Sequence, residues 1–299
     1  MSEVRAHADA LPAPTSLGRV AVDLIALVKP RIMVMALLTA AGAAALAPGV
    51  PDTTRTLLLL VGTAFIVGSA NALNMYLERD IDCMMTRTRN RPLPQRRLAP
   101  GTALWFGVAL GAASVPLLFA AGTLTGGLGL VALASYVAVY TPLKQRTHWA
   151  TWIGAVPGAL PVLMGWAAAT ESIDAAGLSV FAVLFFWQIP HFHAIAMYRQ
   201  REYKDAGLKT LPGEHGAAAA RVQIGVFLVV QVAASLAVAA CGVTGTPYLV
   251  VAIALGALVL AQGLPGVRHG DLRWARRVFA ASLVYLPILF ITMVLDGRL

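Results

Sequence analysis

Charged residues are scarce in this chain of 299 residues, where they account for 12% of the sequence. That share is about half of what soluble globular proteins contain. Hydrophobic residues make up 58%, and a soluble domain of that composition would leave large apolar patches in water. A single, very hydrophobic soluble domain is therefore the weaker interpretation, and the composition predicts an integral membrane protein.

Cysteine and the common signatures of soluble enzymes are also nearly absent. The two cysteines, Cys83 and Cys241, exclude a disulfide scaffold and do not have a metal-binding spacing. The sequence contains no Walker A motif, no GxGxxG that opens a nucleotide-binding domain, no CxxC and no GxSxG. No soluble nucleotide-binding, dithiol or serine-hydrolase module is expected.

Long runs without any charged residue divide the chain into segments of membrane-spanning length. A helix needs about 20 apolar residues to cross the hydrocarbon core. Two runs, 98–143 and 222–267, have 46 residues each, and turn-forming residues predict a break in them at Gly122–Gly127 and Gly242–Pro247. The other runs are 32–51, 56–77, 149–170, 175–198 and 278–295. Together they predict an all-α bundle of nine transmembrane helices.

Lysine and arginine fall almost entirely on one side of such a bundle. With nine spans, 21 of the 23 basic residues lie on the side of the N-terminus, and only Arg55 and Arg298 lie on the other. Cytoplasmic loops carry this excess, so we expect the N-terminus inside and the C-terminus outside. The net charge of +9 is thus a sign of membrane topology and not of nucleic-acid binding.

The first 28 residues are expected to form a cytoplasmic tail. They lack the continuous apolar core of a signal peptide, since Pro12 and Pro14 interrupt them, and their acidic residues do not suit a mitochondrial transit peptide. Residues 29–299 are then one transmembrane domain. A bacterial inner membrane, with the chemistry at the cytoplasmic ends of the helices, is the simplest location.

An acidic set at helical spacing marks the first long inner segment, Asn71 to Arg97. Asn74, Glu78 and Asp82 follow one another at intervals of four, so they share a helix face and span about 12 Å. Oxygen ligands of this kind suit a hard divalent cation such as Mg²⁺. The alternative is a solvated helix end whose acidic residues are counter-ions.

Three arginines follow this set at every second position, in a predicted loop. They are Arg87, Arg89 and Arg91. Guanidinium groups beside a Mg²⁺ site suit phosphate or diphosphate, although they also fit the positive-inside rule alone. Asp80 is turned away from Glu78 by roughly 160° of helix rotation, so we expect it to have a lesser role.

The second long inner segment begins inside an apolar run that carries Gln188, His191 and His193 beside Pro190. An intramembrane histidine is a functional candidate by default, and the alternative is a hydrogen bond between helices. Further on, Glu202 and Asp205 lie among cations, which suggests a second acidic cluster or a solvated loop helix. A shorter inner loop holds Tyr140, Thr141, Lys144 and Arg146, which line a pocket or serve topology only.

These segments together resemble the UbiA-type intramembrane prenyltransferases over nearly the whole chain, and within them the subfamily that farnesylates protohaem. The resemblance rests on their joint order and spacing. The matching segments are LVKPRI (27–32), the stretch 74–94 with RTRNRPLP, YTPLK (140–144), VPGALP (156–161), WQIPHF (187–192) and the stretch 203–212.

The resemblance implies a nine-span bundle with two acidic motifs that bind Mg²⁺ and an isoprenyl diphosphate. Asn74, Glu78 and Asp82 match the first motif, with Glu78 where many members have Asp. Glu202 belongs to the second motif, but the chain reads Gln-Arg-Glu-Tyr at 200–203 where members often read Arg-Glu-Asp-Tyr. Diphosphate and substrate contacts are expected from the three loop arginines, Tyr140, Lys144, Arg146 and Asp205.

The substrates implied by the resemblance are farnesyl diphosphate and haem B, and the product is haem O for terminal oxidases. A haem substrate gives an intramembrane His a partner, because imidazole is a common haem-iron ligand. We therefore expect His191 to contact haem through the iron or a propionate, with His193 as the substitute. Membrane lipid surrounds the bundle, and haem A synthase or oxidase assembly proteins are candidate partners.

Two other functions compete with this one. The first is a related enzyme that prenylates an aromatic acid or a quinone precursor. The second is a transporter or haem chaperone, against which the concentration of charged residues on one face argues, because alternating access needs both faces.

Overall fold

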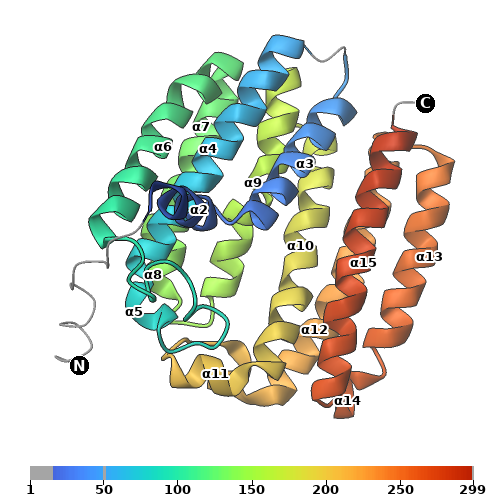
Figure 1. Cartoon of the computed structure of the whole chain (residues 1–299). Coiled ribbons are helices and arrows are strands. Elements are labelled where there is room, and N and C mark those ends of the chain that lie inside the picture. Colours follow the sequence, from blue (N-terminus) through green and yellow to red (C-terminus); the bar gives the residue numbers. More distant parts are fainter. Residues whose placement is uncertain (1–15, 50–51, 298–299) are drawn as a thin grey trace.

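The structure is a computed structural model that describes residues 16–49 and 52–297, and this part of the chain consists of helices and their connections (Figure 1). Eight of its helices are long and apolar enough to cross a membrane. They are α4 (Thr53–Leu77), α6 (Pro100–Ala121), α7 (Thr123–Ala134) with its continuation to Leu143, α9 (Ala150–Thr170), α10 (Ala175–Tyr198), α12 (Leu211–Ala240), α13 (Thr246–Gly263) with α14 (Gly266–His269), and α15 (Leu272–Asp296).

A ninth apolar helix, α3 (Pro30–Leu46), has 17 residues and is shorter than the other eight. Each predicted apolar segment therefore contains one helix, and the all-helical membrane bundle is confirmed. The count of nine spans and the sides of the two ends stay predictions. Residues 1–15, which make up most of the predicted tail, and Arg298 lie outside the described residues.

The two 46-residue runs are both interrupted where turn-forming residues cluster. α6 ends at Ala121 and α7 begins at Thr123, so only Gly122 separates them and the break is shorter than predicted. The second break, Cys241–Gly245, contains Gly242 at φ 73°, a left-handed conformation that glycine adopts without steric cost and that commonly ends a helix.

Short helices gather at one end of the bundle, the lower end in Figure 1. They are α5 (Arg79–Asp82), α8 (Thr141–Leu143), α11 (Gln200–Asp205) and α14. α7 also changes before it reaches this end, because Ser135–Tyr140 form a π-helix, η1. Such π-helical turns are rare and frequently occur at functional sites. The lower end is thus the irregular end of the molecule.

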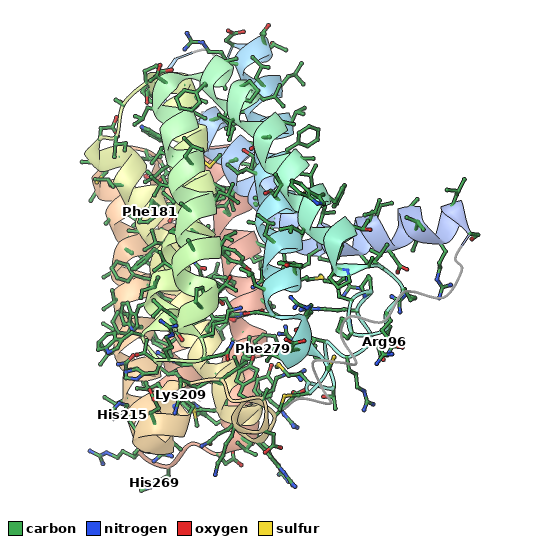
Figure 2. The ribbon with its side chains drawn as sticks, turned by 90° about the vertical axis from the view of Figure 1, so that its left-hand side faces the viewer. Arg96, Phe181, Lys209, His215, His269 and Phe279 are labelled. Atoms are coloured by element: carbon green, nitrogen blue, oxygen red, sulfur yellow. The ribbon has the colours of Figure 1, made fainter. Side chains whose placement is uncertain are left out.

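The amphipathic helix α2 (Leu17–Leu27) projects sideways from this bundle (Figure 2). Its inner face is held by Leu27, which packs against Ala72 and Leu98, and by Asp23, whose carboxylate lies 3.0 Å from Nε of Arg97. Leu17, Val22 and Ile25 are exposed on α2. A helix with one apolar exposed face suits the membrane–water interface.

Small residues let the helices approach closely, as is common in membrane bundles. One close approach joins α3 to α9, where a Cβ added to Gly165 would overlap the carbonyl oxygen of Ala40. Backbone cannot move aside as a flexible side chain can, so this position requires glycine.

We predict that Gly165→Ala lowers the free energy of unfolding by about 1–3 kcal/mol, because the added methyl group forces α3 away from α9. Gly127→Ala in α7 is the matched control, since its Cβ would meet no atom within 4 Å. Thermal unfolding in detergent measures both variants. Equal melting temperatures would contradict the close approach of α3 and α9.

Candidate active site

A cavity of about 460 Å³ lies inside the bundle. Its polar walls are near the irregular end, and its apolar walls include Ile66, which precedes Asn74 by about 12 Å along α4. Basic side chains outnumber acidic ones among the described residues that line it. The five basic residues are Lys29, Arg87, Arg91, Lys144 and Lys209, and the two acidic residues are Glu78 and Asp82. The polar end is therefore suited to an anion.

The acidic set lies on one wall of this cavity, as its spacing predicts. α4 ends at Leu77, and Glu78 leaves the helical conformation at φ −96° and ψ 7° before α5 begins. The hydrogen bonds from Glu78 N to Asn74 O and from Asp82 N to Glu78 O nevertheless keep the helical interval of four. Asn74, Glu78 and Asp82 are exposed by only 1%, 7% and 3%.

Each member of the acidic set contacts one cation from another part of the chain or the next loop. The three contacts are Lys29 Nζ to Asn74 Oδ1 at 3.0 Å, Lys144 Nζ to Glu78 Oε1 at 2.8 Å, and Arg91 Nη1 to Asp82 Oδ2 at 2.7 Å. A carboxylate buried without a partner would be strongly destabilising. Lys144 and Arg91 therefore balance the charges of the two carboxylates, whereas Lys29 donates to a neutral amide.

A hydrogen-bond chain orients the Asn74 amide. Its Nδ2 donates to Thr141 Oγ1 at 3.2 Å, and the Thr141 hydroxyl donates to the carbonyl oxygen of Tyr136 at 2.8 Å. The Tyr136 carbonyl belongs to η1, so the π-helical turn supplies the acceptor. With its NH₂ group engaged, Asn74 presents its oxygen to Lys29. Thr141 thus positions a cavity residue from behind.

The charges at the polar end influence one another. Burial, together with Arg91 and Lys144, lowers the pKa of Lys29 from 10.5 to about 7. Burial also raises the pKa of Asp82, against the opposing effect of Arg91. Burial opposes the charge of Lys144 as well, but Tyr140 and Glu78 raise its pKa above the usual value. An added anion would favour the protonated form of Lys29.

Two tyrosines from η1, Tyr136 and Tyr140, add aromatic surface to the cavity. Their ring centroids lie 5.1 Å apart. The Nζ of Lys144 lies 4.4 Å from the ring centroid of Tyr140, which is cation–π distance. Tyr140 and Lys144 therefore line the cavity, and their role in substrate binding stays a prediction.

Glu202 lies outside the cavity lining drawn from the described residues. Its carboxylate accepts hydrogen bonds from Thr86 Oγ1, from the backbone N–H of Arg87 at 3.3 Å and from Arg199 at 2.9 Å. Burial opposes the charge of Glu202, but the hydrogen bonds from Thr86 and Arg199 hold its pKa below the usual value. Glu202 joins the loop after α5 to α11, and the structure does not bring it to the Asn74 set.

Three more predicted substrate residues lie at the surface, away from the described cavity walls. They are Arg89, Arg146 and Asp205. Of the three loop arginines, only Arg87 and Arg91 line the cavity. The loop is a series of turns and not an extended strand, so residues at every second position do not share one side. The second acidic segment contributes Tyr203 and Lys209 to the cavity instead.

The two intramembrane histidines are buried in contacts between helices and do not line the described cavity. His191 Nδ1 lies 2.7 Å from the Ser282 hydroxyl of α15, and its ring stacks on Trp187. His193 Nε2 lies 3.0 Å from Gln223 Oε1 of α12. Trp187 and Gln188 of the same helix do line the cavity. The haem contact of His191 thus remains a prediction that this arrangement does not favour.

Lys29, Tyr136, Tyr203 and Lys209 were not assigned a role from sequence. Lys29, Tyr203 and Lys209 lie within segments that carry the resemblance, so that signal was available for them. The cavity position of Tyr136 could not be predicted from sequence. It lies within a long apolar run, and its orientation depends on the π-helical turn.

The UbiA prenyltransferase family matches residues 35–292 of the chain. The chain belongs to this family. Its UbiA-family relatives include a protoheme IX farnesyltransferase of Myxococcus xanthus, 49% identical over 284 residues, with 94% of this chain and 96% of the relative covered. One from Sorangium cellulosum is 51% identical, with 86% and 92% covered.

Solved structures of other membrane proteins have the same fold. A digeranylgeranylglyceryl phosphate synthase superposes with a TM-score of 0.79 at 13% identity, and covers 95% of this chain and 100% of its own. A UbiA homologue from Archaeoglobus fulgidus, bound to DMAPP and Mg²⁺, gives a TM-score of 0.66 at 16% identity, with 91% and 99% covered.

We predict that Asp82→Ala lowers prenyl-transfer turnover by about 100-fold or more, because it removes a charged group from the cavity. Asp80→Ala is the matched control, since Asp80 carries the same charge two residues away, outside the described cavity walls. Turnover per folded protein in membranes is the measurement. Near-normal turnover of the Asp82 variant would remove the basis for an acidic site.

We predict that His191→Ala lowers stability, by about 0.6 kcal/mol for the hydrogen bond alone, and leaves the spectrum of bound haem unchanged. Ser282→Ala is the matched control, because it removes the same hydrogen bond from the other side. A shifted haem spectrum in the His191 variant alone would instead establish the haem contact predicted from sequence.

Proposed function

We propose that this chain transfers a farnesyl group from farnesyl diphosphate to a vinyl group of haem B, with addition of water. The products are haem O and diphosphate. The relatives named protoheme IX farnesyltransferase support the substrates, since they are 45–51% identical to this chain. The observation that carries the chemistry is a single cavity whose cationic end continues into apolar walls.

We propose further that α3 is a ninth membrane span. Its 17 residues correspond to about 26 Å of helix, close to the roughly 30 Å of the hydrocarbon core, and small differences in length are accommodated by local thinning. The distribution of the basic residues supports a cytoplasmic position, in a bacterial cell, for the N-terminus and the polar end of the cavity. Its inner membrane is the proposed location.

The acidic set fits Mg²⁺. Asn74, Glu78 and Asp82 offer only oxygen ligands, all three are nearly buried, and all three line one cavity. Hard oxygen donors with carboxylates are what Mg²⁺ sites use. These three residues would hold the ion after their present contacts with Lys29, Lys144 and Arg91 open. When bound, Mg²⁺ would neutralise charge on the diphosphate as it leaves. Glu202 is kept as a ligand candidate only if α11 moves.

The cations of the cavity then have a direct role. Arg87 and Arg91 suit the oxygens of a diphosphate through their planar donors, and Lys144 adds a point charge. These groups stabilise the negative charge that develops as the carbon–oxygen bond of farnesyl diphosphate breaks. Lys29, freed from Asn74, is placed to join them.

The remaining walls shield and stabilise the farnesyl cation. Apolar residues such as Ile66 and Leu133 exclude water from the chain, which delays hydrolysis of the cation. The faces of Tyr136 and Tyr140 are suited to a positive charge, as the position of Lys144 over Tyr140 illustrates. Attack by the vinyl carbon forms the new bond, and water completes the hydroxyethylfarnesyl group. Haem O is then available to terminal oxidases or to a haem A synthase.

We predict that membranes carrying this chain convert haem B and farnesyl diphosphate to a pigment with the mass of haem O. The reaction should stop in excess chelator, recover with Mg²⁺ and be inhibited by diphosphate, because both the ion and the anion act at the polar end. Mass spectrometry of the extracted pigments measures the product. Full activity in chelator would refute the metal requirement, and transfer to an aromatic acid in place of haem would establish the competing function.

A further inference from the structure

Three metal-ligating side chains meet outside the cavity. His148 precedes α9, and Glu214 and His215 lie in the first turn of α12. One ligand atom from each lies within 4.8 Å of the others. The sequence separates His148 from Glu214 by 66 residues, so only the fold brings the three together. We name them the His148 cluster.

The chain holds the His148 cluster in a defined arrangement. Glu214 Oε2 lies 2.7 Å from His148 Nδ1 and accepts the backbone N–H of His148 at 3.1 Å. The rings of His148 and His215 meet edge to face, with centroids 4.7 Å apart. Gly216 follows at φ 82°, which breaks the helical path of α12 directly after His215. The first turn of α12 is therefore set apart from the long helix and directed at the loop of His148.

The donor chemistry differs from that of the acidic set in the cavity. Two imidazoles and one carboxylate form a ligand set that zinc commonly uses, with a further position open to water. Mg²⁺ prefers oxygen ligands and does not compete well for imidazole. We propose that the His148 cluster binds one divalent transition-metal ion of the zinc class. This proposal does not rest on the prenyl-transfer function.

The position of the His148 cluster gives such an ion a structural effect on the part of the polar end formed by Lys144 and Lys209, here called the cavity mouth. The backbone N–H of Lys209 donates to the carbonyl oxygen of Lys144 at 2.8 Å, and Lys209 Nζ lies 3.8 Å from Glu214 Oε1. Both lysines line the cavity. An ion bound to the cluster fastens the loop 144–149 to the beginning of α12. The ion also neutralises the Glu214 carboxylate, which weakens its ion pair with Lys209. The Lys209 side chain can then turn toward the cavity.

The test is a zinc titration of the purified, untagged full-length protein in detergent, followed by calorimetry. Excess Mg²⁺ is present throughout, so that the oxygen ligands of the cavity are saturated. We expect one zinc ion per wild-type chain. Loss of outer partners of a metal site costs about 10–100-fold in affinity, so loss of a ligand in His148→Ala or His215→Ala should cost about 100-fold or more.

His269→Ala is the matched control. His269 is an exposed histidine at the same end of the bundle and lies outside the cluster (Figure 2). Its removal should leave zinc affinity unchanged. If His148→Ala does not fold, Glu214→Gln replaces it, because the amide can still accept the His148 N–H but supplies a weaker ligand. No zinc binding by the wild type, or equal affinity in the cluster variants and His269→Ala, would reduce the cluster to an ion pair and overturn the proposal.

Amide hydrogen exchange tests the fastening separately. Zinc should slow exchange in residues 145–149 of the wild type at least several-fold, and should have no effect there in His215→Ala. Zinc binding without slower exchange in this loop would overturn the proposed fastening of the cavity mouth.

Discussion

Charge burial governs how this bundle is built at its irregular end. Glu78 and Asp82 sit in an apolar protein with 10% and 4% of their side chains exposed, and such carboxylates are costly unless each has a partner. The partners are Lys144 and Arg91, which come from different loops. Burial of either carboxylate without its cation would be strongly destabilising. The loops that carry Lys144 and Arg91 therefore pack against the segment of Glu78 and Asp82. The same two ion pairs thus neutralise the buried carboxylates and fix the positions of the loops around the cavity.

A second layer of contacts keeps those loops in place. Glu202 binds Thr86 and Arg199, and so it joins the loop after α5 to α11. Asp23 of α2 pairs with Arg97, at the far end of the same loop. These carboxylates act on the chain and not on the cavity. Four carboxylates of the irregular end therefore fall into two groups: Glu78 and Asp82 line the cavity, whereas Asp23 and Glu202 hold its surrounding loops in place.

The helices themselves contribute through departures from regularity. The π-helical turn Ser135–Tyr140 gives Thr141 an acceptor, and Thr141 in turn orients Asn74. Gly165 allows α3 to approach α9 until a side chain would collide with backbone. A regular α-helix at Ser135–Tyr140 would leave the polar end differently shaped. The π-helical turn and the close packing of α3 on α9 together shape the bundle around the cavity. The ion pairs of Glu78 and Asp82 lie on the wall of that cavity.

Much of this protein was predictable from sequence by itself. Charge-free runs located every long helix, and the interval of four predicted that Asn74, Glu78 and Asp82 would share a wall, because membrane length and helical period are local properties. The partners of those residues were not predictable, since Lys29 lies 45 residues from Asn74. Nor could spacing show that Glu202 would turn to Thr86, or that His191 would find Ser282 91 residues away. Only the tertiary structure decided these contacts, because a buried polar group takes whichever partner the packing of distant segments brings within reach.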